Sequence, residues 1–166
     1  MIVKTSEIVN SFKQYWPEAY DSLALPLRVL LFQAHSTHEA ASSGVVTRHG
    51  LSLVEFSTLS SLRRTPPPHA LTPSEIQHSM LITSGGLTKI LVQLEERGLV
   101  TRPTHDGDRR IKPVALTERA LQVLDETVAE LNEVVFGWFS QTLNGQEMEQ
   151  LATLLNKLTN TEFLKK

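Results

Sequence analysis

The amino-acid sequence predicts a mainly α-helical protein with one small β-hairpin. Three observations support this prediction: apolar residues recur at helical spacing along most of the chain, a strong start signal opens two short successive helices, and a strand–turn–strand pattern follows them directly. Of the 166 residues, 40% are hydrophobic and 20% are charged. This composition provides the core of one ordinary domain and argues against intrinsic disorder.

Three helices are expected before the triple proline at 66–68, which forbids helix. An amphipathic stretch at 8–16 predicts the first helix, which the following proline ends. Residues 22–47 carry many leucines and small residues, which predicts a long helix with a bend at Pro26 and a glycine cap at its end. Ser52 is expected to cap a third helix, which begins directly after it.

The next segment has the spacing of a helix-turn-helix. Residues 72–75 (Thr-Pro-Ser-Glu) combine a capping threonine, a proline at the first helical position and a glutamate three residues after the cap. The helix that they open is expected to reach about Met80. Thr83 or Ser84 then caps a second helix, which ends at Arg97 and Gly98. Two short helices joined by about three residues are typical of a helix-turn-helix.

A β-hairpin is expected directly after these helices. Residues 99–102 are strand-like, residues 105–108 (His-Asp-Gly-Asp) have turn chemistry, and residues 114–116 return to strand. Pro113 cannot donate a backbone hydrogen bond, so its strand is expected at the edge of the sheet. A hairpin in this position is the wing of a winged helix-turn-helix.

The last third of the chain predicts two helices with narrow apolar stripes. Thr117 caps the first helix, and Asn144 with Glu147 starts the second. The stripes either face the chain's own core or form a dimer interface, and their heptad-like spacing on acidic helices favours the interface. The stripe residues are Leu121, Leu124, Val128, Leu131, Val135 and Trp138 in the first helix and Met148, Leu151, Leu155 and Leu158 in the second.

The charge of the chain is unevenly distributed. The formal net charge is −2, from 16 basic and 18 acidic residues, which by itself argues against nucleic-acid binding. Residues 63–119 nevertheless carry a net charge of +3, whereas residues 1–62 carry −1 and residues 120–166 carry −4. The basic segment coincides with the winged module, which makes its charge compatible with a nucleic-acid partner.

Several functional classes are disfavoured. The absence of cysteine excludes disulfides, thiolate metal sites, iron–sulfur clusters and thiol sensing. Nucleotide-binding glycine loops and hydrolase motifs are missing, so we expect neither an enzyme nor a bound cofactor. His35, His38 and Glu39 lack a further ligand nearby, so no metal site is expected. Without a signal peptide or a long apolar run, the chain is expected in the cytoplasm rather than in a membrane.

Four segments of the central module resemble the MarR family of winged-helix transcription regulators. They are residues 71–75, 84–89, 94–100 and 108–117, of which the last contains the pattern Asp-x-Arg-x-x-x-Val-x-Leu-Thr. The order of elements extends the resemblance over about residues 22–162. The resemblance implies a homodimer formed by helices from both chain ends, a palindromic DNA operator, and weakening of DNA binding by a small effector.

The resemblance implies three parts and a set of DNA-binding residues. Residues 1–49 and 118–166 would form the dimerisation lobe, and residues 50–117 the DNA-binding lobe. The second helix of the motif enters the major groove and the wing reaches the minor groove, where Arg110 would insert with Asp108 or Asp106 orienting it. Arg63, Arg64 and Arg102 are candidates for phosphate contact. The DNA-binding candidates are Thr83, Ser84, Gly85, Gly86, Thr88, Lys89, Asp108, Arg109, Arg110 and Lys112.

The resemblance also places an effector pocket where the dimer helices meet the winged lobe. Its candidate residues are Phe32, His35, His38, Phe56 and Leu59, because aromatic and histidine side chains are common in such clefts. We therefore expect a sequence-specific DNA-binding regulator that acts as a repressor. A winged helix that serves only as a protein-interaction module, without specific DNA binding, is the alternative.

Overall fold

A computed structural model gives the structure of the protein, and it describes residues 3–80, 84–102 and 113–160. The chain divides into two compact units, Met1–Ser42 and Ser43–Lys166. In the part of the chain that the structure describes, no helix is both long enough and apolar enough to cross a membrane.

The first unit contains a short helix beside the beginning of a long one. Helix α1 (Thr5–Tyr15) ends before proline as predicted, and a 3-10 turn at Pro17–Ala19 follows it. Helix α2 (Ala24–Arg48) continues into the second unit. Pro26, where a bend was predicted, lies in the first turn of α2. In the first turn a helix needs no backbone donor, so proline is tolerated there.

Side-chain contacts hold α1 against α2 within the first unit. The Thr5 hydroxyl donates a hydrogen bond to the Gln33 side-chain oxygen at 2.7 Å. The Gln33 amide nitrogen donates in turn to the carbonyl of Val3 at 2.9 Å. The Arg28 guanidinium lies 5.9 Å from the centre of the Phe12 ring. Helix α1 is therefore a docked part of this unit.

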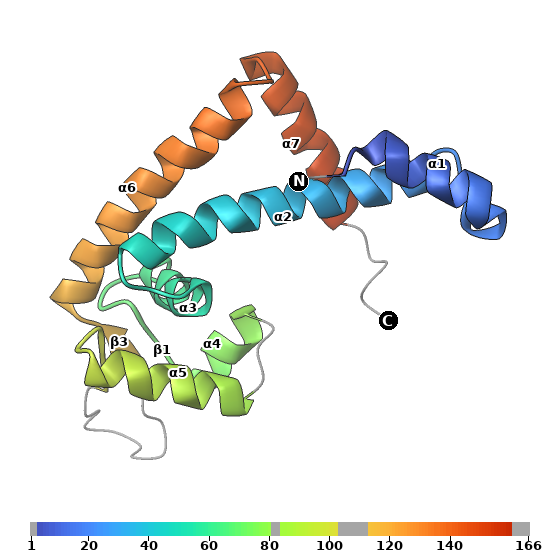
Figure 1. Cartoon of the computed structure of the whole chain (residues 1–166). Coiled ribbons are helices and arrows are strands. Elements are labelled where there is room, and N and C mark those ends of the chain that lie inside the picture. The colour runs from blue at the N-terminus through green and yellow to red at the C-terminus, as the bar shows by residue number, and fades with distance from the viewer. Residues whose placement is uncertain (1–2, 81–83, 103–112, 161–166) are drawn as a thin grey trace. The chain divides into compact units, whose positions relative to one another are not determined.

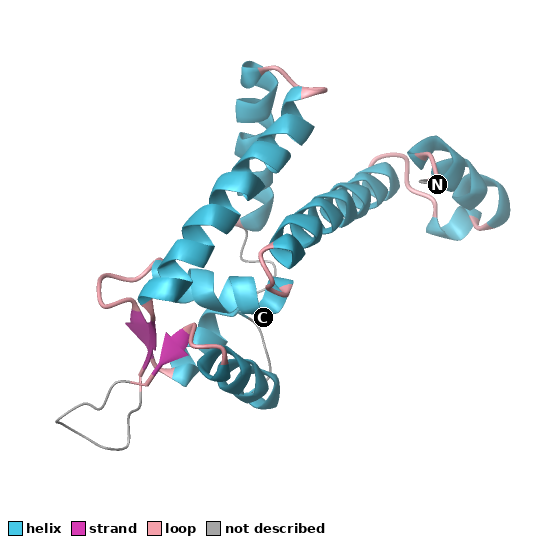
Figure 2. Cartoon of the chain, turned by 60° about the vertical axis from the view of Figure 1, so that its left-hand side comes forward, coloured by secondary structure: helices cyan, strands magenta, loops and turns pink. Residues whose placement is uncertain are grey.

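The second unit holds the winged helix-turn-helix (Figure 1). Helix α6 leads away from the sheet and α7 folds back from its far end, while Figure 2 shows the small sheet beside the N-terminal end of α6. The expected mainly α-helical fold with a small β-wing is confirmed. Its elements are α3 (Leu53–Arg63), β1 (Ala70–Leu71), α4 (Pro73–Met80), α5 (Ser84–Glu96), β2 (Val100–Thr101), β3 (Val114–Leu116), α6 (Glu118–Ser140) and α7 (Gly145–Thr159).

The helix starts of this unit are the capped positions that the sequence indicated. At α3, the Glu55 amide donates to the Ser52 hydroxyl at 3.3 Å while the Ser52 amide donates to the Glu55 carboxylate at 2.8 Å. Helix α4 repeats this reciprocal pair with Thr72 and Glu75. Each such cap stabilises its helix by about 1 kcal/mol. Local side-chain chemistry therefore sets these boundaries.

The sheet differs from the predicted hairpin by one additional strand. Its order is β1–β3–β2, with both pairings antiparallel. The expected edge position of the Pro113 strand is wrong, because β3 lies in the centre of the sheet. The strand begins one residue later, at Val114, so the missing proline donor lies outside it. Strand β1 was not predicted because two residues carry no alternating pattern.

One hydrophobic core joins α3, α4, α5, the sheet and the first turns of α6. Burial of a leucine side chain contributes about 1.5–3 kcal/mol, so this cluster dominates the stability of the unit. Its buried members are Val46, Leu51, Leu59, Leu62, Ile76, Leu87, Leu91, Leu94, Leu99, Val100, Val114, Ala120 and Leu124.

The apolar stripe of α6 is mostly half-buried in this chain, and that of α7 is mostly exposed. Leu124 is the stripe residue of α6 that enters the core, whereas Val128 is exposed. Helix α7 has no buried residue, and Leu158 is 60% exposed. The described chain therefore leaves an apolar surface along its C-terminal helices.

Candidate nucleic-acid interface

Helix α5 has one buried side and one exposed side. Leu87, Leu91 and Leu94 point into the core. Gly85, Thr88 and Lys89 are exposed, while Gly86 is half-buried. The predicted base-reading residues of this helix that the structure describes thus lie mainly on the face that a partner can reach.

Two further residues extend this exposed face. Val92 and Gln93 lie one turn beyond Thr88 and Lys89, and both are exposed. Neither was predicted as a DNA-binding residue, although the helical period that places the leucines inward also places these two outward. A glutamine amide can pair bidentately with adenine in the major groove, which makes Gln93 a candidate base reader.

Gly85 is not required by packing within the chain. A Cβ atom built at this position would meet no atom within 4 Å. Glycine in a helix costs up to about 1 kcal/mol relative to alanine. Packing among the described residues therefore does not account for a glycine at this position.

The candidate phosphate-binding cations differ in their engagement. Arg102 donates to Glu95 at 3.1 Å, and Arg63 lies 3.7 Å from Asp125. The Arg64 side chain donates from Nε to the Ser60 carbonyl at 3.3 Å. No ion pair within the described residues involves Lys89 or Arg64.

Part of the predicted interface lies outside the described residues. This holds for Thr83 and for the wing residues Asp106, Asp108, Arg109, Arg110 and Lys112. Helix α5 begins at Ser84, in agreement with a start at this position. The role of the wing residues stays a prediction.

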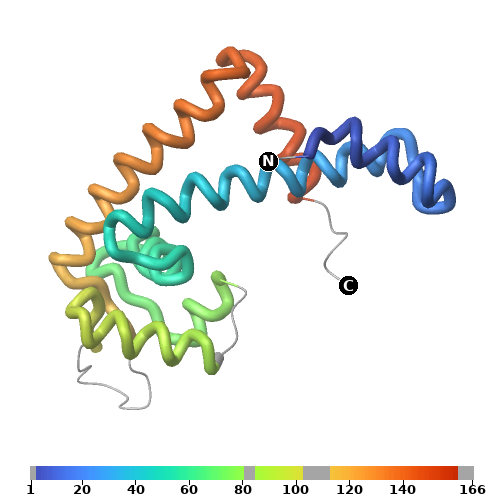
Figure 3. The backbone as a smooth tube through the Cα atoms, in the orientation of Figure 1, coloured from blue at the N-terminus to red at the C-terminus, as the bar shows by residue number. Residues whose placement is uncertain are grey.

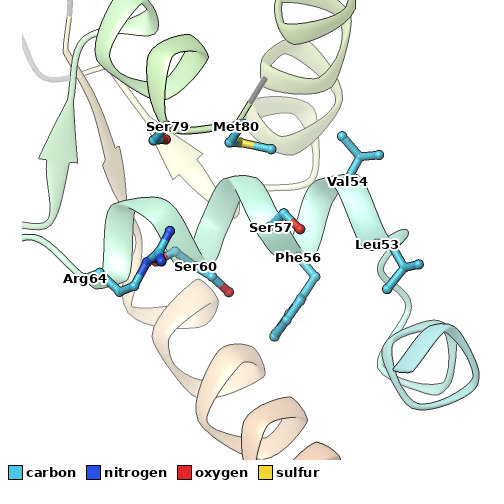
Figure 4. A pocket seen from close by; sticks show the side chains of 8 residues that line it. All are labelled: Leu53, Val54, Phe56, Ser57, Ser60, Arg64, Ser79 and Met80. Carbon is cyan, nitrogen blue, oxygen red and sulfur yellow. The ribbon is translucent and has the colours of Figure 1, made fainter. Parts of the chain in front are cut away.

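A cavity of about 650 Å³ lies between α3 and α4. Figure 4 shows Val54 and Ser57 on the side of α3 that faces Ser79 and Met80, while Phe56 points away from them. The lining combines apolar side chains, three hydroxyls and one guanidinium, which suits a small amphipathic anion. The lining residues are Leu53, Val54, Phe56, Ser57, Ser60, Arg64, Ser79 and Met80.

The five predicted effector residues are distributed over both units. Phe32 is 71% exposed, and His38 lies 3.4 Å from the Ser42 hydroxyl. His35 contacts Glu39 at 3.9 Å. Phe56 lines the cavity on α3, whereas Leu59 is fully buried in the core. A common pocket for the five stays a prediction, and among the described residues no group of three His, Cys, Asp or Glu side chains is placed to hold a metal.

The C-terminal end of α5 is tied to the beginning of α3. Arg97 donates from Nη1 to the Glu55 carboxylate at 2.8 Å and from Nη2 to the Gly50 carbonyl at 2.7 Å. Burial works to raise the pKa of Glu55, but hydrogen bonds from the Ser52 amide and hydroxyl, together with the Arg97 guanidinium, hold this pKa below its ordinary value of 4.5. Glu55 is therefore ionised at neutral pH and pairs with the arginine.

Comparison with known proteins identifies the family. A family model described as MarR family matches residues 49–111. The HTH-type transcriptional regulator PecS of Dickeya dadantii (strain 3937) is 30% identical over 126 residues, which cover 75% of this chain and 76% of PecS. The chain belongs to the MarR family. It is thus a transcription regulator of the winged-helix class, as the four sequence segments implied.

Solved structures of MarR family proteins share this fold. A mutant MarR from E. coli in complex with operator DNA aligns with a TM-score of 0.68 at 22% identity, covering 80% of this chain and 93% of that one. BpsR of Bordetella bronchiseptica, whose DNA binding is regulated by 6-hydroxynicotinic acid, aligns with a TM-score of 0.66 at 23% identity, covering 80% and 91%. Both likenesses confirm the winged-helix architecture of the MarR fold.

Proposed function

We propose that this MarR family regulator binds a palindromic operator as a homodimer, represses transcription from it, and releases it when a small organic effector binds. The exposed face of α5 carries the proposal. It presents Gly85, Thr88, Lys89 and Gln93 on one side of a helix whose other side is fixed in the core. Helices of this kind read bases with their N-terminal residues.

The surface chemistry of α5 favours DNA over a protein partner. A protein interface is expected to be centred on large apolar or aromatic anchors. On the exposed face of α5, Val92 is the one large apolar residue, and hydroxyl, amide and ammonium groups surround it. Phosphate oxygens and the acceptor atoms of base edges accept hydrogen bonds from groups of this kind.

The homodimer is supported by the exposed apolar stripe of α7. Leucines at 151, 154, 155 and 158 are exposed on one helix of the described chain. A second copy would remove these side chains from water, and a two-fold dimer would present two recognition helices to a palindrome. The predicted division into two dimer segments and a DNA-binding segment belongs to this proposal.

The proposed effector site is the cavity between α3 and α4. It borders α4, the first helix of the helix-turn-helix, so a ligand there would contact the element that precedes α5. Regulation of BpsR by 6-hydroxynicotinic acid gives a precedent within the same fold. A ligand weakens operator binding only if it binds the DNA-competent dimer less tightly than another state.

Selection of bound sequences from random DNA tests the proposal directly. We expect a palindrome with half-sites about 10 base pairs apart. If six to ten phosphates are neutralised, affinity should fall by about 10³–10⁵-fold between 50 and 200 mM salt. Absence of any gel shift at low salt would instead favour the protein-interaction module.

Substitution of the wing arginine is a sharper test of specificity. We expect Arg110→Ala to reduce operator affinity by at least about 30-fold, because each of the two half-sites would lose a base or groove contact worth about 1–3 kcal/mol. Dimerisation, measured by sedimentation, should be unchanged. Unaltered operator affinity in a titration at fixed salt would remove Arg110 from the interface.

A further inference from the structure

Arg97 lies at a junction of four segments of the second unit. It follows directly after Glu96, the last residue of α5, which is the yellow-green helix in the backbone trace of Figure 3. Its guanidinium donates to Glu55 in the first turn of α3 and to the carbonyl of Gly50, which follows α2. Its own carbonyl accepts a hydrogen bond from Arg119 of α6 at 3.2 Å. These contacts join the end of α5 to α3, to α6 and to the segment that follows α2.

The carboxylate that holds Arg97 is itself fixed in place. The backbone amide and the hydroxyl of Ser52 donate to Glu55 Oε2 at 2.8 and 2.9 Å, which leaves Oε1 for the arginine. The side chain of Glu55 is only 12% exposed, so its position is set by packing as well as by hydrogen bonds. The anchor is therefore more rigid than an exposed ion pair between two mobile side chains.

Because α5 is long, a small tilt at its Arg97 end displaces the residues at its N-terminal end. Ser84 and Glu96 are separated by about 18 Å at 1.5 Å per residue. A tilt of about 3° at the Arg97 end would therefore move the N-terminal residues by about 1 Å. Hydrogen bonds to base edges tolerate little displacement, whereas attraction to phosphates is long-ranged and forgiving.

We propose that Arg97 is a positioning residue that fixes the angle of the recognition helix and thereby sets operator discrimination. This inference rests on the proposed function. Arginine is required because one planar fork serves two acceptors from different segments, which a single ammonium point charge does not reproduce. Arg97 acts through α5 and makes no base contact of its own.

The test compares Arg97→Lys with Arg48→Lys. Arg48 also donates from Nε to a carboxylate, that of Glu130, at 2.9 Å, but the described hydrogen bonds of its side chain are to α6 and not to α5. For each full-length protein, equilibrium titrations give the Kd for the selected operator, for an operator with one changed base pair per half-site, and for unrelated DNA. The free energy of unfolding is measured in parallel.

We expect Arg97→Lys to reduce the ratio between operator and altered-operator affinities by at least tenfold. Its affinity for unrelated DNA and the salt dependence should stay within twofold of the original protein, since the charge is kept. Arg48→Lys should match the original protein in all three titrations. A role in stability alone would lower the free energy of unfolding and leave the discrimination ratio unchanged, which overturns the inference.

A second variant keeps the test decisive if Arg97→Lys does not fold. Glu55→Gln retains an oxygen for Ser52 but removes the charge that holds Arg97, and we expect the same loss of discrimination. Equal weakening of all three DNAs by both variants would assign Arg97 to phosphate contact and reject positioning. If the original protein itself does not discriminate, the proposed function fails; if it discriminates and both variants do so equally, only this inference fails.

Discussion

The winged module and the terminal helix α7 use the same kind of residue in opposite ways. Leucines 87, 91 and 94 of α5 are buried in the core of their own chain. Leucines 151, 154, 155 and 158 of α7 have equally regular spacing, yet all are exposed. The apolar face of the first region is therefore covered by its own chain, whereas we propose that a second copy covers that of the second region.

This difference shows how much the spacing of apolar residues predicts about a helix. Apolar periodicity alone indicates that one face of a helix is to be covered, and it does not say by what. In α5 the covering residues come from α3, α4 and the sheet of the same unit. In α7 the four leucines stay exposed in the described chain, so this helix is where the proposed dimer is best tested.

The largest effect is expected from truncation of a core leucine. Leu91→Ala should lower the free energy of unfolding by about 2–5 kcal/mol, because the substitution removes buried methyl groups and leaves a cavity. Chemical denaturation at two protein concentrations measures this loss, which should be the same at both. A loss that grew on dilution would show that α5 also depends on assembly, and would contradict the contrast between α5 and α7.

Truncation on α7 should act on association instead. Leu155→Ala is expected to weaken the proposed dimer by about 2 kcal/mol, or about 30-fold in its dissociation constant, since both copies would lose apolar contact. Sedimentation over a range of concentrations measures this shift. Leu91→Ala, compared at a concentration where it is folded, should leave the dissociation constant unchanged; an unchanged constant for Leu155→Ala would place the interface elsewhere.

The parts of the structure that the sequence predicts are those determined locally. Ser52, Thr72, Thr117 and Asn144 each cap the helix that follows, because the groups involved lie within three residues of one another. The helix-turn-helix and the outward face of α5 follow from the same short-range periodicities. The resemblance to the MarR family adds the expectation that the outward face of α5 binds DNA.

The parts that were missed depend on distant segments. Strand β1 exists because β3 offers it an edge, and nothing in Ala70 and Leu71 indicates this pairing. Arg97 and Glu55 are 42 positions apart, so their ion pair cannot be read from spacing. The cavity between α3 and α4 likewise arises from packing. Leu59 shows the same limit, since the sequence does not tell a pocket residue from a core residue on one helix.

Acid should weaken the winged module through Glu55. The folded protein holds the pKa of this carboxyl below 4.5, so the stabilisation is complete above that pH and is lost as the pH falls through the lower, folded value. Thermal unfolding between pH 7 and 3 should show this loss. Glu55→Gln should show a shallower decline on the acid side, and an identical decline would mean that other carboxylates account for it.

The smallest effect is expected at Gly85 and has opposite signs in the two assays. Gly85→Ala should stabilise the fold by up to about 1 kcal/mol, since the new methyl group meets no atom within 4 Å. Operator affinity should fall, because the methyl group would occupy space that the backbone shares with DNA. Denaturation and operator titration of the same preparation measure both. Increased stability with unchanged operator affinity would mean that the glycine is needed neither for packing nor for DNA binding. Gly85 would then not belong to the proposed DNA-binding face of α5.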